Sequence, residues 1–226
     1  MTGRLPRGCA VTAILLTATL VTGCGGPQMS PVRTAADDAE FAMARDENFI
    51  FKRTVAEVQE QIFTGGWSVG EYGDVPSACG GDGYAFFMVR WLPDGFSFQE
   101  QGPQKMVELH SWMALHGWKM EPIPRYSEGI DNVVVMGSKR DGNVARLDVD
   151  LLPGVAADGT TDVLQLRAKS TCQPGAATEI LERLRGPFQA VPVDPGLPNL
   201  ESPRDTPLFE PFDQKTPHPR PAESDQ

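Results

Sequence analysis

Two acidic side chains stand where acid–base chemistry could arise. Asp148 and Asp150 are two residues apart in an alternating run that predicts a strand, so both carboxylates point to the same face. The same run carries Arg146, and the next predicted strand carries Arg167 and Lys169. Opposite charges on neighbouring strands pair across a sheet. We therefore interpret these five residues as a solvated, mixed-charge face, which is the candidate binding face of the protein.

The histidines do not form a site. His110 and His116 lie six positions apart on one predicted helix, residues 103–117. At about 100° per residue, their side chains point roughly 120° apart around that helix and cannot share a ligand. The chain also has no P-loop, no GxSxG sequence and no GxGxxG sequence that opens a helix after a strand. We assign no catalytic, cofactor-binding or metal-binding residue.

The N-terminal segment has the pattern of a secretory signal peptide. Arg4 and Arg7 precede a run of apolar and small residues from Cys9 to Gly23, and this segment holds no acidic residue. As a helix the run would span roughly 22 Å, less than the ~30 Å hydrocarbon layer of a bilayer. It also lacks the polar face and the caps of a buried core helix. Residues 1–23 are therefore predicted to be a signal.

The end of this segment resembles the lipobox of bacterial lipoproteins. Residues 21–24 read Val-Thr-Gly-Cys, with Val21 in the place of the common leucine. In proteins with this signal the thiol receives diacylglycerol and the cysteine becomes the first residue after cleavage, a role that the resemblance assigns to Cys24. One acyl chain anchors a protein only marginally, whereas two hold it stably. The alternative is ordinary signal cleavage, with Cys24 left as a thiol or a disulfide partner.

Two cysteines remain once Cys9 leaves with the signal and Cys24 is acylated. Exported compartments favour disulfides, and Cys79–Cys172 is then the one intramolecular pair available. The two residues flank predicted strands whose ends would meet if the strands are antiparallel neighbours. A metal site would need further ligands at metal-binding spacings, and a catalytic thiol would need a histidine partner. The sequence shows no motif for either, so it favours the disulfide.

The charge of the chain bears on its partners. The net charge of −10 argues against nucleic acid, because phosphate binding needs a basic patch. Loss of residues 1–23 removes two arginines and no acid, which makes the net charge −12. Such a chain is not drawn to anionic headgroups, so membrane contact is expected through the Cys24 anchor. No apolar run reaches the ~18 residues of an ordinary transmembrane helix.

Composition and breaker residues divide the chain into four parts. They are the signal 1–23, a tether 24–35, a folded domain 36–186 and a Pro-rich tail 187–226, which is predicted to be disordered. Within the domain, the patterns predict a helix within 36–64, strands at 67–72 and 84–92, a helix at 103–117, strands at 118–120, 132–138, 144–152 and 163–170, and a helix at 176–185. The strand 84–92 is apolar on both faces, which is typical of a central strand.

Periodic patterns define the expected core. In the helix 103–117, Met106, Leu109 and Met113 form the buried stripe, with Trp112 and Leu115 beside it. In the last two long strands every second residue points inward: Ala145, Leu147, Val149 and Leu151, then Leu164, Leu166 and Ala168. One apolar and one polar face per strand predicts an α+β fold, a two-layer sandwich of a mostly antiparallel sheet with helices packed on one face.

Three functional hypotheses are compatible with these features. The first is a non-enzymatic lipoprotein that binds an envelope protein or glycan through the candidate binding face: Arg146, Asp148, Asp150, Arg167 and Lys169. The second is a carrier with an apolar cavity between helices and sheet, suggested by five large residues: Phe86, Phe87, Met88, Met106 and Met113. The third is an extracytoplasmic hydrolase whose residues no motif marks.

The order of these features resembles the small actinobacterial lipoproteins of the LppA type. The matching features are the lipobox, a long helix, a tryptophan before a loop with one cysteine, Gly83-Tyr84 opening a strand, Gly117-Trp118 ending a helix, Thr171-Cys172 ending a strand, and a Pro-rich tail. The resemblance covers roughly residues 17–190, and its specific parts are the lipobox and the placement of two cysteines. It implies an α/β domain anchored on the outer face of the cell membrane, and it implies no catalytic residues.

Overall fold

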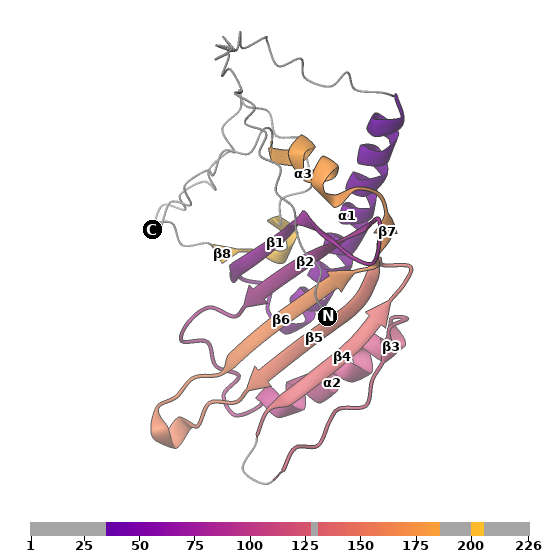
Figure 1. The fold of residues 1–226 in the computed structure, drawn as a ribbon. Coiled ribbons are helices and arrows are strands. Elements are labelled where there is room, and N and C mark those ends of the chain that lie inside the picture. Colours follow the sequence, from indigo (N-terminus) through magenta and orange to yellow (C-terminus); the bar gives the residue numbers. More distant parts are fainter. Residues whose placement is uncertain (1–34, 128–130, 186–199, 206–226) are drawn as a thin grey trace, which may run out of the picture. The chain divides into compact units, whose positions relative to one another are not determined.

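A single antiparallel sheet organises the part of the chain that the structure, a computed structural model, describes: residues 35–127, 131–185 and 200–205 (Figure 1). Its eight strands follow the order β3-β4-β5-β6-β2-β1-β8, with β7 paired to β2 off this path. The elements are α1 (Ala35–Ile62), β1 (Trp67–Ala78), β2 (Gly83–Trp91), α2 (Gly102–Leu115), β3 (Lys119–Met120), β4 (Val133–Lys139), β5 (Val144–Leu152), η1 (Ala156–Asp158), β6 (Val163–Ser170), β7 (Gln173–Pro174), α3 (Ala177–Arg185), β8 (Leu200–Glu201) and η2 (Pro203–Asp205).

The long helices α1 and α2 lie behind the sheet in Figure 1 and cover one of its faces, here called the inner face. The α1 stripe formed by Phe51, Val55 and Val58 is completely buried, because its spacing of four and three residues keeps one side of the helix against the strands. Asn48 of the same helix donates from Nδ2 to the Gly73 carbonyl of β1 at 2.6 Å. The predicted fold class, α+β with helices on one face of a mostly antiparallel sheet, is confirmed.

The alternation predicted for β5 and β6 is confirmed except at one residue. Leu147 and Val149 are fully buried, and so are their β6 partners Ala168 and Leu166. Ala145, however, is exposed, and Val144 takes the buried position instead. The ladder between β5 and β6 shifts register between residues 144 and 146. A bulge of this kind adds one residue to one strand and reverses the side-chain direction beyond it.

A sharp turn that contains Asp141 and Gly142 joins β4 to β5. The Asn143 amide donates to the Arg140 carbonyl at 3.0 Å, and Asn143, rather than the glycine, holds the left-handed φ of 54°. The glycine serves a close approach, since a Cβ on Gly142 would lie 2.5 Å from the Thr54 Cγ2 of α1. The Asn143 side chain also donates to the Glu47 carbonyl at 3.0 Å. The turn therefore docks the hairpin onto α1.

The apolar stripe predicted for α2 is correct, with one residue misplaced beside it. Met106, Leu109 and Met113 are buried against the sheet. Leu115 is 85% exposed, so the prediction that it lies beside the stripe is wrong. Trp112 is half-buried and stacks on His116 with 4.2 Å between ring centroids. Leu115 ends the helix, at a point where no described neighbour covers that side.

The predicted disulfide between Cys79 and Cys172 is present in the structure. Cys79 lies just before β2 and Cys172 just after β6, and these strands are antiparallel neighbours. The approach leaves no room for a side chain at Gly83, where a Cβ would lie 2.8 Å from the Cys172 Sγ. The disulfide therefore joins two adjacent strands at one end of the sheet.

The central strand β2 carries a charged residue into the core. Arg90 points to the inner face and is fully buried. Its guanidinium donates to the carbonyl of Glu71 at 2.5 Å and to the carboxylate of Glu201 at 3.0 Å. Because a buried charge is tolerated only when it is paired and hydrogen-bonded, this ion pair fixes residue 201 against the sheet.

Residues 200–205, which lie within the predicted tail, form β8 and η2. Leu200 and Glu201 form β8, which pairs with Ser68 and Trp67 of β1. Pro203 is buried, and Arg204 donates to the Glu60 carboxylate of α1 at 2.6 Å. The remainder of the predicted tail, the signal 1–23, Cys24 and nearly all of the tether lie outside the described residues.

Tyr84 should ionise at a higher pH than an ordinary tyrosine. Its ring is buried against Phe86, with 5.6 Å between ring centroids. Burial, and then the charges of Glu47 and Glu40, raise the pKa of Tyr84 from 10.0 to about 12. Since the folded state keeps this proton more tightly than the unfolded state, the free energy of unfolding falls as pH rises from about 10 to about 12.

An absorbance titration of phenolate formation measures this directly. We expect a late phase near pH 12 that Tyr84→Phe removes, together with the loss of stability over that interval. A native protein that shows no phase near pH 12, or one whose late phase survives in Tyr84→Phe, would contradict the expectation.

Candidate functional site

The predicted binding face lies on the side of the sheet opposite α1 and α2, here called the outer face. The register between β5 and β6 places Arg146 opposite Lys169, and Asp148 opposite Arg167. Asp150 stands opposite Gln165. On three neighbouring strands, the outer face carries alternate residues: Arg146, Asp148 and Asp150 of β5, Gln165, Arg167 and Lys169 of β6, and Phe87, Val89 and Trp91 of β2.

Asp148 is paired along its own strand and not with β6. Arg146 Nε donates to both carboxylate oxygens of Asp148 at 2.9 Å. The hydrogen bond and the charge of Asp148 raise the pKa of Arg146. Asp150 accepts a hydrogen bond from Asn132 Nδ2 at 3.4 Å. The expected cross-strand pairing of Asp148 with Arg167 is thus replaced by pairing with Arg146, two residues away on the same strand.

The two β6 cations remain available. Arg167 and Lys169 are exposed, and within the described residues neither side chain makes a hydrogen bond or an ion pair. Arg167 faces Asp148 in register, but Arg146 already engages that carboxylate. The structure therefore leaves two adjacent positive charges open to solvent on a chain whose net charge is negative.

An apolar row runs beside these cations, and the sequence reasoning missed it. Phe87, Val89 and Trp91 of β2 stand opposite Lys169, Arg167 and Gln165 of β6. Phe87 is 40% exposed and Trp91 is half-buried. The sequence signal that could have revealed this row is the alternation of large apolar residues at positions 87, 89 and 91. A strand that is apolar on both faces is expected to be covered on both, whereas the described helices α1 and α2 cover one face.

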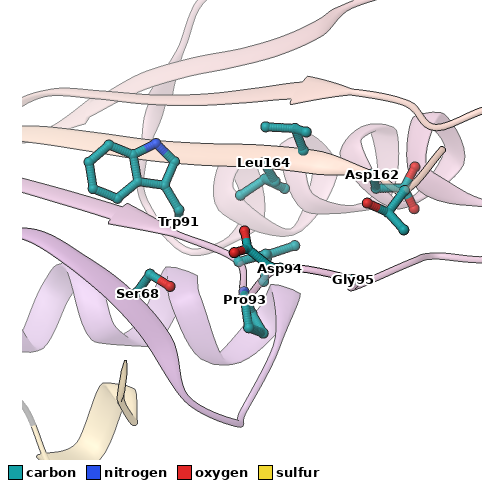
Figure 2. Close-up of a pocket in the computed structure, with 10 residues that line it drawn as sticks. Ser68, Trp91, Pro93, Asp94, Gly95, Asp162 and Leu164 are labelled. Carbon is teal, nitrogen blue, oxygen red and sulfur yellow. The ribbon is translucent and has the colours of Figure 1, made fainter. Parts of the chain in front are cut away.

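A pocket of about 360 Å³ lies where this row ends. Figure 2 shows Trp91 and Asp94 on its β2 side, Asp162 and Leu164 on its β6 side, and Ser68 on β1. Pairing of Trp91 with Gln165, and the hydrogen bond from the Leu92 amide to the Leu164 carbonyl at 3.1 Å, bring these two chain segments together. The pocket continues the outer face from which Trp91 projects.

One of the two pocket carboxylates has a structural role. Asp162 is buried, and its oxygens accept from the backbone amides of Phe98 and Gly154, the latter at 2.8 Å. It therefore joins the chain before α2 to the chain after β5. Asp94 is exposed and has no such partner among the described residues. Of the two, Asp94 is the carboxylate that a ligand could engage.

The residues that suggested an apolar carrier do not share one cavity. Phe86, Met88, Met106 and Met113 are buried in the core between helices and sheet. Phe87 projects from the outer face instead. The pocket at Trp91 is lined by none of the five. The methionines thus serve as core side chains that fill irregular space between α2 and the strands.

The histidines lie apart, as their spacing predicts. His110 Nε2 is 3.0 Å from the Glu121 carbonyl, and His116 Nδ1 is 2.7 Å from the Trp112 carbonyl. Among the described residues there is no group of three or more histidine, cysteine or acidic side chains placed to hold a metal ion.

Two further results bear on the chain as a whole. Within residues 35–127, 131–185 and 200–205, no helix has both the length and the apolar character needed to cross a membrane. No family model, no curated protein and no solved structure matches this chain.

Proposed function

We propose that this protein is a lipoprotein anchored through Cys24 on the extracytoplasmic side of the cell membrane, and that its folded part is a binding module and not an enzyme. The Val-Thr-Gly-Cys sequence and the signal-like segment before it support the anchor. The Cys79–Cys172 disulfide supports an oxidising compartment. The resemblance to actinobacterial lipoproteins of the LppA type agrees with both.

The observation that carries the binding role is the outer face. It places Arg167 and Lys169, both exposed and without a partner among the described residues, beside the aromatic side chains of Phe87 and Trp91. Arginine and large aromatic residues are the side chains that contribute most to binding energy at protein interfaces. The two cations would add attraction to an acidic partner and speed its association.

The anchor assignment has a direct chemical test. In cells fed a labelled fatty acid, the natural chain should take up label and the Cys24→Ala chain should take up none, because the thiol that carries the diacylglycerol is gone. The natural chain should also enter the detergent phase on phase partitioning. Equal labelling of the two chains, or recovery of the natural chain in the aqueous phase, would contradict the assignment of Cys24 as the anchor.

Charge reversal on the outer face tests the binding role. Arg167→Glu with Lys169→Glu should reduce capture of envelope components by the full-length chain at least tenfold, because both open cations become repulsive to an acidic partner. The matched control is Arg53→Glu with Arg125→Glu, which makes the same change of charge at exposed sites elsewhere. Quantitative mass spectrometry of cross-linked envelope preparations gives the measurement. Equal loss in both double variants would show that net charge, and not this face, governs capture.

A further inference from the structure

We infer that the pocket at the end of β2 binds an uncharged sugar ring, so that the ligand of the outer face is a glycan. The inference rests on the proposed function, whose ligand class it names. Within the described part of the chain, it follows from three properties of the pocket: an aromatic ring held in place, polar side chains without partners, and the absence of a basic side chain from the lining.

The aromatic ring is Trp91, and β1 holds it in place. A Cβ on Gly70 would lie 2.1 Å from Cζ3 and 2.2 Å from Cη2 of the indole. The ring therefore rests on a strand position that only glycine can supply. Pro93 and Val163, which is 55% exposed, add apolar surface around the pocket. A fixed aromatic face flanked by apolar atoms suits the C–H face of a pyranose, which loses little entropy on stacking because both rings are rigid.

The polar side chains of the pocket can serve hydroxyl groups. Ser68, Asp94 and Thr161 line it, and within the described residues their side-chain oxygens make no hydrogen bond to another residue. Ser68 stands directly opposite Trp91 in the β1–β2 ladder. Two hydroxyls and one carboxylate offer both donors and acceptors. A polyol can use all of them, whereas a simple cation would use the carboxylate and the ring alone.

The charge of the lining excludes an anionic group from the pocket itself. Among the residues that the structure describes, Asp94 and Asp162 are the charged residues of its lining, and no lysine or arginine lines it. The Asp162 carboxylate is already satisfied by two backbone amides. The volume of about 360 Å³ falls within the range of about 300–1,000 Å³ that small-ligand sites occupy. A longer chain leaving the pocket would pass over Val89 and Phe87, beside Arg167 and Lys169.

Binding is tested on the full chain in detergent micelles by nuclear magnetic resonance of the indole N–H groups. The probes are methyl glucoside, methyl mannoside, methyl galactoside, methyl arabinoside and N,N′-diacetylchitobiose. Choline, Nα-acetyl-lysine amide and glucose 6-phosphate serve as the charged comparison. We expect at least one neutral probe to shift the Trp91 signal saturably, and none of the charged probes to do so. The inference would be overturned if no neutral probe shifted the Trp91 signal. It would also be overturned if choline or the lysine derivative shifted that signal saturably and the neutral probes did not.

Variants then locate the site. Trp91→Ala should weaken binding of the active probe at least tenfold, and Asp94→Asn at least threefold. Asp141→Asn, an exposed carboxylate in the β4–β5 turn, is the matched control and should leave affinity unchanged. If Trp91→Ala fails to fold, Trp91→Tyr replaces it, since this variant keeps an aromatic face. Asp94→Asn then provides the main test, because the Asp94 side chain is exposed and its replacement should not disturb the fold. Unchanged affinity in Asp94→Asn and Trp91→Tyr would place the sugar elsewhere.

The failure of this inference is distinguishable from that of the proposed function. Loss of envelope capture on charge reversal at Arg167 and Lys169, with no sugar binding at Trp91, would reject the sugar and leave the binding face intact. Sugar binding at Trp91, together with envelope capture that the charge reversal does not affect, would keep the sugar site and reject the role of Arg167 and Lys169.

Discussion

Glu201→Ala should lower the free energy of unfolding by about 3–5 kcal/mol, the cost typical of removing one partner of a buried ion pair. The Arg90 side chain is completely buried and that of Glu201 is 13% exposed, with 3.0 Å between Nη2 and Oε2. Removing the carboxylate leaves the guanidinium in the core with a smaller set of acceptors. The loss should appear as an earlier midpoint in urea at an unchanged slope.

A double variant separates the charge from the packing. Arg90→Met with Glu201→Leu removes both charges and keeps apolar volume, and such replacements of buried ion pairs are often close to neutral. We therefore expect the double variant to be more stable than Glu201→Ala alone. Glu182→Ala, at an exposed glutamate of α3, is the control and should change stability by less than about 0.5 kcal/mol. A cost below about 1 kcal/mol for Glu201→Ala would show that β8 does not secure the core.

Replacing Cys79 and Cys172 with serine should cost up to about 4–5 kcal/mol. The disulfide closes a loop with a sequence separation of 93 residues, and in the chain-entropy model a loop of about this length restricts the unfolded chain by that amount. Reduction of the natural chain should produce the same loss, because it removes the same restriction. Urea unfolding with and without a thiol reductant measures both.

The thiol count provides the control for this prediction. The native oxidised chain should show no reaction of residues 79 and 172 with a thiol reagent, and both should react after reduction. The serine variant should be insensitive to reductant. Two titratable thiols at these positions in the exported, unreduced protein would contradict the bridge in its natural setting.

The periodic placement of apolar residues along the chain made much of the fold predictable. Side chains alternate across a strand, so the inward positions of β6 follow from residues 163–170 alone. The buried stripe of α2 follows from helical spacing in the same way. The disulfide followed from counting, because the predicted signal and the predicted acylation of Cys24 leave one pair of cysteines. These features follow from neighbouring residues or from composition. They do not depend on contacts between residues far apart in the sequence.

The candidate binding face was predictable in part. The sequence placed Arg146, Asp148 and Arg167 on one face, which the register confirms. It could not show that Arg146 would take the Asp148 carboxylate, since two acceptable partners existed at similar spacing. It also did not indicate that Phe87, on the outer side of β2, would stay exposed among the described residues. Whether an apolar strand face is covered depends on where the helices pack, and that depends on the whole sheet.

By itself the sequence determined the local elements, the direction in which most strand side chains point, and the pairing of Cys79 with Cys172. Tertiary structure alone decided the burial of Arg90, whose partner Glu201 lies 111 residues away, and the pocket that joins segments near Trp91 and Leu164. The physical reason is the distance along the chain over which each kind of interaction acts. Periodicity and propensity act over one or two turns of chain, whereas an ion pair or a pocket between distant segments exists only after strand pairing has brought them together.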